Sequence, residues 1–287
     1  LHGASADGSL AGRLQVEGNF NQLGYLGGIS GKRFNSLEGG GDVGEQKPTA
    51  YDELDGDLKL NYRLTGGGEL IFAHQISRQF DVPKTSEVTL GDKLKFNYEP
   101  QLRSLSYLEY RGRHDEAALV SDVKLNVSFN RQKEGEEIVK VSTPTLETRE
   151  ITDVKTVGAT SQFSSKLGRS HQLTYGFDFY RDLFDTRMTL TDLTTGTATA
   201  MTPGTPDGAK YESWGVYLQD EVRFTDRFET ILGVRYAHFK AEGAIGINQL
   251  NLSDGEATGS INALYRLAPR WNLVGGVAQG YRAPSME

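Results

Sequence analysis

Residues 214–239 read WGVYLQDEVRFTDRFETILGVRYAHF and hold the clearest pattern in the chain. After the polar turn Thr225-Asp226-Arg227, apolar and polar side chains alternate. One parity is occupied by Phe228, Thr230, Leu232, Val234 and Tyr236, and the other by Glu229, Gly233 and Arg235. A period of two around a tight turn predicts an antiparallel hairpin with one apolar face. Aromatic residues end this face, with Phe224 beside the turn and Trp214 at the far end, as is typical of strands that cross a bilayer.

The same hairpin recurs along the whole chain. Leu58, Leu60 and Tyr62, for example, alternate with Lys59 and Asn61. No amphipathic helical period competes with this pattern, so the sequence predicts an all-β protein with twelve antiparallel strands. The expected strands cover about residues 13–20, 24–34, 58–64, 69–79, 102–110, 117–129, 149–163, 171–182, 214–224, 228–239, 257–267 and 271–281.

The connections between these strands alternate in length. Short turns follow the odd strands and long polar loops follow the even ones, so all long loops are expected on one side of the sheet. The expected loops lie at about residues 36–54, 80–100, 132–147, 183–211 and 241–254. Outer-membrane barrels have this asymmetry, with short periplasmic turns and long external loops. A soluble β-sandwich or lipocalin-like barrel would explain the alternation but neither the aromatic ends nor the one-sided loops. We therefore expect an antiparallel transmembrane β-barrel.

Composition agrees with this class and excludes others. The longest apolar runs are far shorter than the ~20 residues of a membrane helix, and the mean hydropathy of −0.47 suits a barrel in which only alternate residues face lipid. The chain has no Cys, which excludes disulfides and thiolate metal sites. The net charge of −7, with both signs interspersed, gives no basic stripe for nucleic acid. The chain begins at Leu1, so we expect a fragment or a processed product.

Two other groups of residues resemble binding motifs. Gly39, Gly41 and Gly44 fit G-x-G-x-x-G, but no buried strand precedes them and no helix follows, so a flexible loop is the better interpretation. An oxygen-rich cluster that can hold Ca²⁺ consists of Asp52, Glu53, Asp55 and Asp57. The alternative for this cluster is a solvated loop that leads into a strand. No nucleophile elbow or acid–base pair is present, so we expect neither an enzyme nor a resident cofactor.

The last residues, GYRAPSME, give a more specific indication. Tyr281-Arg282-Ala283-Pro284 resembles the Phe-Arg-Ala-Pro motif of TonB-dependent outer-membrane receptors, notably those for haem and haemoglobin, with Tyr in place of Phe. Similar to the same family are WGVYLQDEVRFTDRFETILGVRY, HQLTYGFDFYRD and AHQISRQFDVPKT. The resemblance covers the whole chain in short pieces.

The resemblance implies a place in a larger barrel. Receptors of this family have 22 strands around a plug. If only the first strand is missing, residues 1–287 form a partial barrel domain, approximately strands 2–13, and the YRAP segment enters the seventh external loop. The chain then lacks the plug, the TonB-contacting box, strand one and about nine C-terminal strands. Any histidine ligand of that loop would lie beyond Glu287.

The resemblance also implies the function and the partners. The expected function is uptake of an iron-bearing ligand, haem or a ferric siderophore, across the bacterial outer membrane. The partners are outer-membrane lipid, the ligand, and the TonB energy-coupling complex, which acts through the missing plug. Tyr281, Arg282, Ala283 and Pro284 are the candidate ligand contacts, although Arg282 can equally brace its loop. The alternatives are uptake of cobalamin or another nutrient, and a self-contained barrel that acts as a passive channel or an outer-membrane enzyme.

Overall fold

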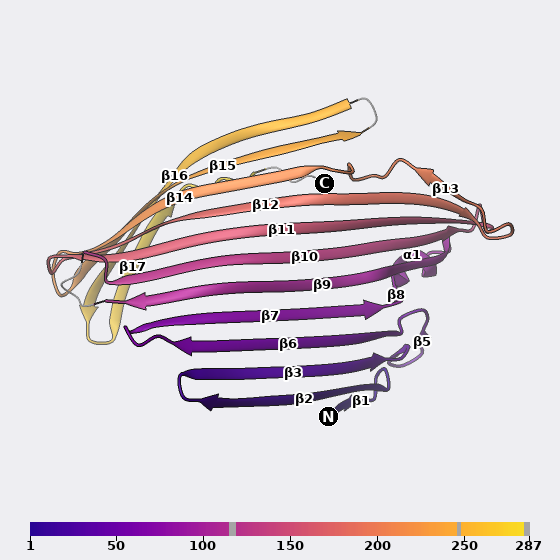
Figure 1. The fold of residues 1–287 in the computed structure, drawn as a ribbon, viewed down its shortest axis with the longest axis horizontal. Coiled ribbons are helices and arrows are strands. Elements are labelled where there is room, and N and C mark those ends of the chain that lie inside the picture. The colour runs from indigo at the N-terminus through magenta and orange to yellow at the C-terminus, as the bar shows by residue number, and fades with distance from the viewer. Residues whose placement is uncertain (115–118, 246–247, 284–287) are drawn as a thin grey trace.

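The computed structural model describes residues 1–114, 119–245 and 248–283. Within these ranges, twelve long strands pair with their chain neighbours in one antiparallel sheet (Figure 1). They are β2 (Ser9–Phe20), β3 (Leu23–Phe34), β6 (Tyr51–Arg63), β7 (Gly68–Phe80), β9 (Lys93–Arg113), β10 (Asp122–Lys140), β11 (Leu146–Leu167), β12 (His171–Asp192), β14 (Lys210–Arg223), β15 (Phe228–Ile245), β16 (Asn248–Ala268) and β17 (Trp271–Ala278). The predicted fold class and the predicted twelve strands are confirmed, as an open sheet that is not closed into a barrel.

The remaining elements are short. They are β1 (His2–Ala4), β4 (Leu37–Gly39), β5 (Gly44–Gln46), β8 (Val82–Pro83), β13 (Ala198–Met201) and the helix α1 (Thr85–Thr89). The glycine-rich segment forms the separate β4–β5 hairpin, in which Gly41 and Gly44 have positive φ. The expectation of no helix is wrong at α1, because five residues are too few to show a helical period. No helix in the described residues is long and apolar enough to cross a membrane.

The register places alternate residues on two chemically different faces. Val234 lies opposite Leu218 on β14 and Gly259 on β16, and its side chain is 54% exposed. Arg235, of the other parity, forms an ion pair with Asp178. We call the face of Val234 the outer face and the face of Arg235 the inner face. The period of two predicted for this hairpin is therefore confirmed.

Connection lengths differ from the prediction. Short turns at residues 21–22, 64–67, 168–170, 224–227 and 269–270 lie along one edge of the sheet, the turn edge. At the opposite, extended edge, three predicted loops are largely strand. β10 continues to Lys140 and meets β11 after only residues 141–145, β12 continues to Asp192, and β15 and β16 extend to Ile245 and from Asn248. The cause is that polar and apolar residues are mixed on both faces there, so the strands continue without an apolar alternation that the sequence could reveal.

Three strand limits also need correction. The strand expected from residue 117 begins at Asp122, and residues 117–118 lie outside the described ranges. β6 begins at Tyr51 rather than near residue 58, so the acidic cluster expected in a loop belongs to a strand. β17 ends at Ala278, before the expected residue 281.

Candidate functional site

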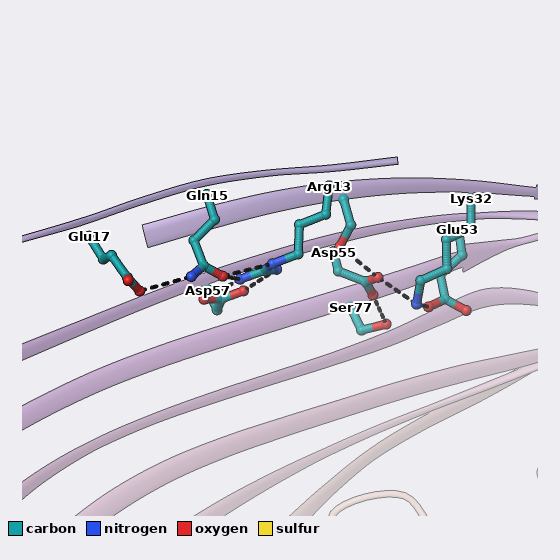
Figure 2. Close-up of polar contacts among 9 residues, drawn as sticks. Arg13, Gln15, Glu17, Lys32, Glu53, Asp55, Asp57 and Ser77 are labelled. Carbon is teal, nitrogen blue, oxygen red and sulfur yellow. Dashed lines mark hydrogen bonds and ion pairs between the residues drawn. The ribbon is translucent and has the colours of Figure 1, made fainter. Parts of the chain in front are cut away.

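The inner face of the first strands carries a continuous ladder of polar contacts (Figure 2). The Arg13 guanidinium on β2 donates to both carboxylate oxygens of Asp57 on β6, with Nη1–Oδ1 at 2.7 Å and Nη2–Oδ2 at 3.1 Å. β3 lies between them, and Gly28 is the residue that Arg13 crosses. Gln15 accepts from Arg13 and donates to Glu17 at 3.0 Å. Bidentate pairs of this kind fix side-chain geometry as well as charge.

A second group of contacts continues the ladder toward the extended edge. The Lys32 ammonium lies 2.5 Å from Glu53 Oε1 and 2.9 Å from Asp55 Oδ2. The Ser77 hydroxyl donates to Asp55 at 2.7 Å, and the Gln79 amide donates to Glu53 at 2.7 Å. Figure 2 shows Lys32 and Ser77 converging on these acids from the neighbouring strands. Carboxylates and donors are thus matched along the inner wall.

This geometry decides where the predicted acidic cluster lies. Glu53, Asp55 and Asp57 share the inner face, each with a cationic partner. Asp52 has the opposite parity and accepts a hydrogen bond from Arg33 Nε at 3.0 Å. The four carboxylates therefore do not converge, and the described residues contain no group of three His, Cys, Asp or Glu side chains placed so that they could hold a metal ion. Ca²⁺ binding there stays a prediction.

Near the extended edge, a cavity of about 390 Å³ opens on the inner face. Three carboxylates line it, those of Glu134, Glu136 and Glu150. Burial, together with the neighbouring charges of Glu134 and Glu150, raises the pKa of Glu136. The amide of Gln101 donates to Glu134 at 3.0 Å. The pocket favours positive charge or a proton at Glu136.

Residues 202–209, which we call the strap, form one side of this cavity. The Gly204 and Thr205 backbone N–H groups donate to Glu150 Oε1 at 2.9 and 3.4 Å. The strap then joins the edge of β12, where the N–H of Phe184 donates to the carbonyl of Ala209 at 3.0 Å. Ala209 is completely buried. The loop predicted at residues 183–211 therefore contains strand residues and an anchored strap.

The YRAP segment follows β17, whose last residue, Ala278, lies opposite Ser260, part-way along β16. The Tyr281 hydroxyl donates to Asp254 Oδ2 at 3.5 Å. Asp254 lies opposite Phe239, whose ring stacks on Tyr211 with centroids 6.1 Å apart. Arg282 is exposed and Ala283 is half-buried, while Pro284 lies outside the described residues. The structure thus brings Tyr281 to an aromatic and acidic part of the inner face.

Sequence reasoning missed two of these features because it assigned part of each, Glu134 with Glu136 and Tyr211, to loops. Glu134, Glu136, Glu150 and Thr152 all have inner-face parity, and continuing the alternation beyond the apolar residues would have placed them together. The Tyr211–Phe239 stack needs the register between β14 and β15, which a single sequence does not provide.

Comparison with known proteins places this architecture in a family. The sequence matches the family model of the TonB dependent receptor-like β-barrel over residues 11–287, and no curated protein matches it. Among solved structures, the copper transporter OprC superposes with a TM-score of 0.79 at 14% identity, covering 98% of this chain and 44% of that chain.

Two further structures are similar. The FrpB iron transporter from Neisseria meningitidis, as apoprotein, has a TM-score of 0.76 at 14% identity and covers 97% of this chain and 44% of its own. The hemophore receptor HasR from Serratia marcescens, in complex with the hemophore HasA and heme, has a TM-score of 0.73 at 13% identity and covers 96% and 43%. The chain spans less than half the length of these proteins, and the likeness shows a shared fold.

Proposed function

Because the chain belongs to the TonB-dependent receptor-like β-barrel family, we propose that it is part of an outer-membrane receptor for an iron-bearing ligand, haem or a ferric siderophore. Residues 1–287 would form strands 2–13 of a 22-stranded barrel, and the TonB complex would act through a plug outside this chain. The similar structures include an iron transporter and a hemophore receptor in complex with heme. The polar inner face and apolar outer face support a wall between water and lipid.

The observation that carries the ligand class is the position of the YRAP segment. Tyr281 contacts Asp254 on the inner face, in the half of β16 toward the edge that would face outward from the cell. A tyrosine beside the Tyr211–Phe239 stack can lie against a flat macrocycle. The exposed guanidinium of Arg282 can bind a carboxylate of the ligand by charge-assisted hydrogen bonds. Ala283 and Pro284 would set the direction of the chain after these contacts.

The proposal is tested by Arg282→Ala in the full-length receptor. One charge-assisted hydrogen bond contributes about 1.5–3 kcal/mol, so ligand affinity should fall roughly 10- to 150-fold. Haem and ferric siderophores are compared in binding to purified receptor and in uptake by cells. Surface expression should stay normal. Arg270→Ala, in the turn before β17, is the matched control and should leave affinity unchanged.

Two results would contradict the assignment. Normal affinity for every iron ligand, together with reduced assembly of Arg282→Ala, would make the motif a folding element. Uptake that persists after deletion of TonB would contradict energy-coupled transport and favour a passive channel.

A further inference from the structure

A groove with a volume of about 310 Å³ lies on the outer face between β9 and β12. Its floor is formed by small side chains, those of Ala159 and Ser161 on β11. Larger side chains flank them, because the register places Val127 beside Ala159, and Leu125 and Phe177 on either side of Ser161. A row of small residues between bulky ones leaves a channel as wide as a strand, lined by apolar groups. Its shape suits an acyl chain.

A cluster of cations lies on the same two strands and the same face. Arg131 binds Asp153 through Nε and Nη2, at 2.9 and 2.6 Å. Lys133 is the cross-strand partner of Asp153, and Lys155 is the partner of Arg131. Asp153 is only 4% exposed and is fully engaged by Arg131. Arg131, Lys133 and Lys155 thus surround Asp153. The next acid on this face, Asp185 on β12, has its own cation in Arg187 at 3.7 Å, so two positive charges are in excess. We call Arg131, Lys133 and Lys155 the basic patch.

The basic patch differs from the other charges at the same level of the outer face. There, Arg33 contacts Asp52 at 3.0 Å and Lys240 contacts Glu242 at 2.5 Å, while Lys95 and Arg149 share Glu137 and Glu147. Lys133 and Lys155 form no ion pair with a described residue. Two lysines without an ion-pair partner on adjacent strands give this part of the outer face a local positive charge, in a chain whose net charge is −7.

The groove and the basic patch are aligned. Arg131 is four residues beyond Val127 on β10, and Lys155 is four residues beyond Ala159 on β11, both toward the extended edge. At about 3.3 Å per residue, the separation along the strands is roughly 13 Å. A lipid with its tail in the groove would place its headgroup at the patch.

We propose that the groove and the basic patch form a binding site for one lipid that carries a phosphate monoester. A phosphate monoester carries about −1.5 to −2 at neutral pH, which complements the two excess positive charges. Lys133 and Lys155 bind the phosphate, and Arg131 positions them through Asp153. The site rests on membrane insertion in the proposed function but not on the identity of the transported ligand.

The test uses the full-length receptor in nanodiscs of phosphatidylcholine with increasing phosphatidic acid. Bound lipid is counted by native mass spectrometry, and thermal stability is measured alongside. Each basic residue near a membrane surface contributes about 1 kcal/mol, a factor of about five. Lys133→Gln with Lys155→Gln should therefore weaken phosphatidic acid binding roughly 30-fold.

The matched control is Lys59→Gln with Lys124→Gln, which removes the same charge from the inner face. It should bind phosphatidic acid like the wild type. Ala159→Trp fills the groove and should lower binding with the patch intact. Ligand uptake by the Lys133/Lys155 variant should stay normal, which separates failure of this site from failure of the receptor function.

Three results would overturn the proposal. They are equal binding of phosphatidic acid by the wild type and the Lys133/Lys155 variant, no preference for phosphatidic acid over phosphatidylcholine, and displacement of the lipid by inorganic phosphate at similar affinity. The last result would assign an ion site without a lipid.

Discussion

Single glycines decide how charges meet across the inner face. The Arg235 guanidinium reaches Asp178 two strands away, with Nη1–Oδ1 at 2.7 Å and Nη2–Oδ2 at 2.8 Å. Gly215 lies beside Asp178 on the intervening β14, and a Cβ there would be 2.3 Å from Arg235 Nη2. Gly28 has the same role between Arg13 and Asp57. The inner face therefore repeats one arrangement over three adjacent strands: an arginine on the first, a glycine on the second and an aspartate on the third.

This arrangement predicts that Gly215→Ala lowers the unfolding free energy of the wild type but raises that of a variant without Arg235. In the wild type, the new methyl group displaces the guanidinium and should cost about 0.5–1 kcal/mol of unfolding free energy, the value of a partly exposed ion pair. In an Arg235→Ala background, the same substitution should stabilise the protein by roughly 0.4–1 kcal/mol, because alanine restricts the unfolded chain. Urea unfolding of the four variants measures the coupling. Equal effects in both backgrounds would refute the steric argument.

Glu136 gives a prediction on pH. Burial and the charges of Glu134 and Glu150 raise its pKa in the folded protein, so folding favours the protonated form. This contribution is fully present below the ordinary pKa of glutamate and is lost as the pH rises through the raised pKa. Glu136→Gln should therefore be more stable than the wild type at pH 7, and the difference should shrink toward pH 4. Unfolding free energies at several pH values test this, and a gap that widens on acidification would contradict it.

At the scale of residues, the sequence predicted the faces but not the partners. The parity of Arg235 placed it on the polar face, whereas its pairing with Asp178 depends on the register of three strands. Register is set by the turns and by side-chain packing across strands, which alternation alone does not specify. The same limit explains why Asp52 was grouped with three carboxylates that lie on the opposite face.

Among the elements, β10 gives the clearest test of which side chains face lipid and which face water. Val123 and Leu125 have outer-face parity, while Lys124 lies on the inner face, 3.4 Å from Glu109. Cysteine at position 124 in the full-length receptor should react with a water-soluble thiol reagent, and cysteines at 123 and 125 should be protected by lipid. Labelling is measured in intact membranes, with detergent-solubilised protein as the control. Equal labelling at all three positions would contradict the assignment of the faces.

Strand ends were the least predictable part of each element. Membrane-facing segments can be recognised in the sequence because lipid requires apolar side chains at every second position. Beyond that band, the backbone hydrogen bonds of β10–β12 continue while both faces meet water, and the side chains follow no period. The acidic pocket and the strap lie in this region, which explains why the sequence indicated loops there.

For the whole molecule, the one-sided connections predict orientation. The turn at Thr194–Gly196 follows the extended end of β12, whereas the turn at Gly168 lies on the turn edge. An epitope tag inserted at Thr195 in the full-length receptor should be detected by antibody on intact cells. The same tag at Gly168 should be detected only after permeabilisation. The reverse result would invert the topology and remove the YRAP segment from the ligand side.

β13 pairs with the end of β12 that extends beyond the β12–β14 pairing. β14 pairs with β12 only from Val222 to Lys210, and residues 198–201 pair with Met188–Thr191 beyond it. Residues 193–209 are therefore inserted where the membrane-facing pairing has already ended. For protein engineering, this segment is a position for grafting a foreign peptide, such as a vaccine antigen: its replacement would remove the β12–β13 pairs and the strap but none of the β12–β14 pairs.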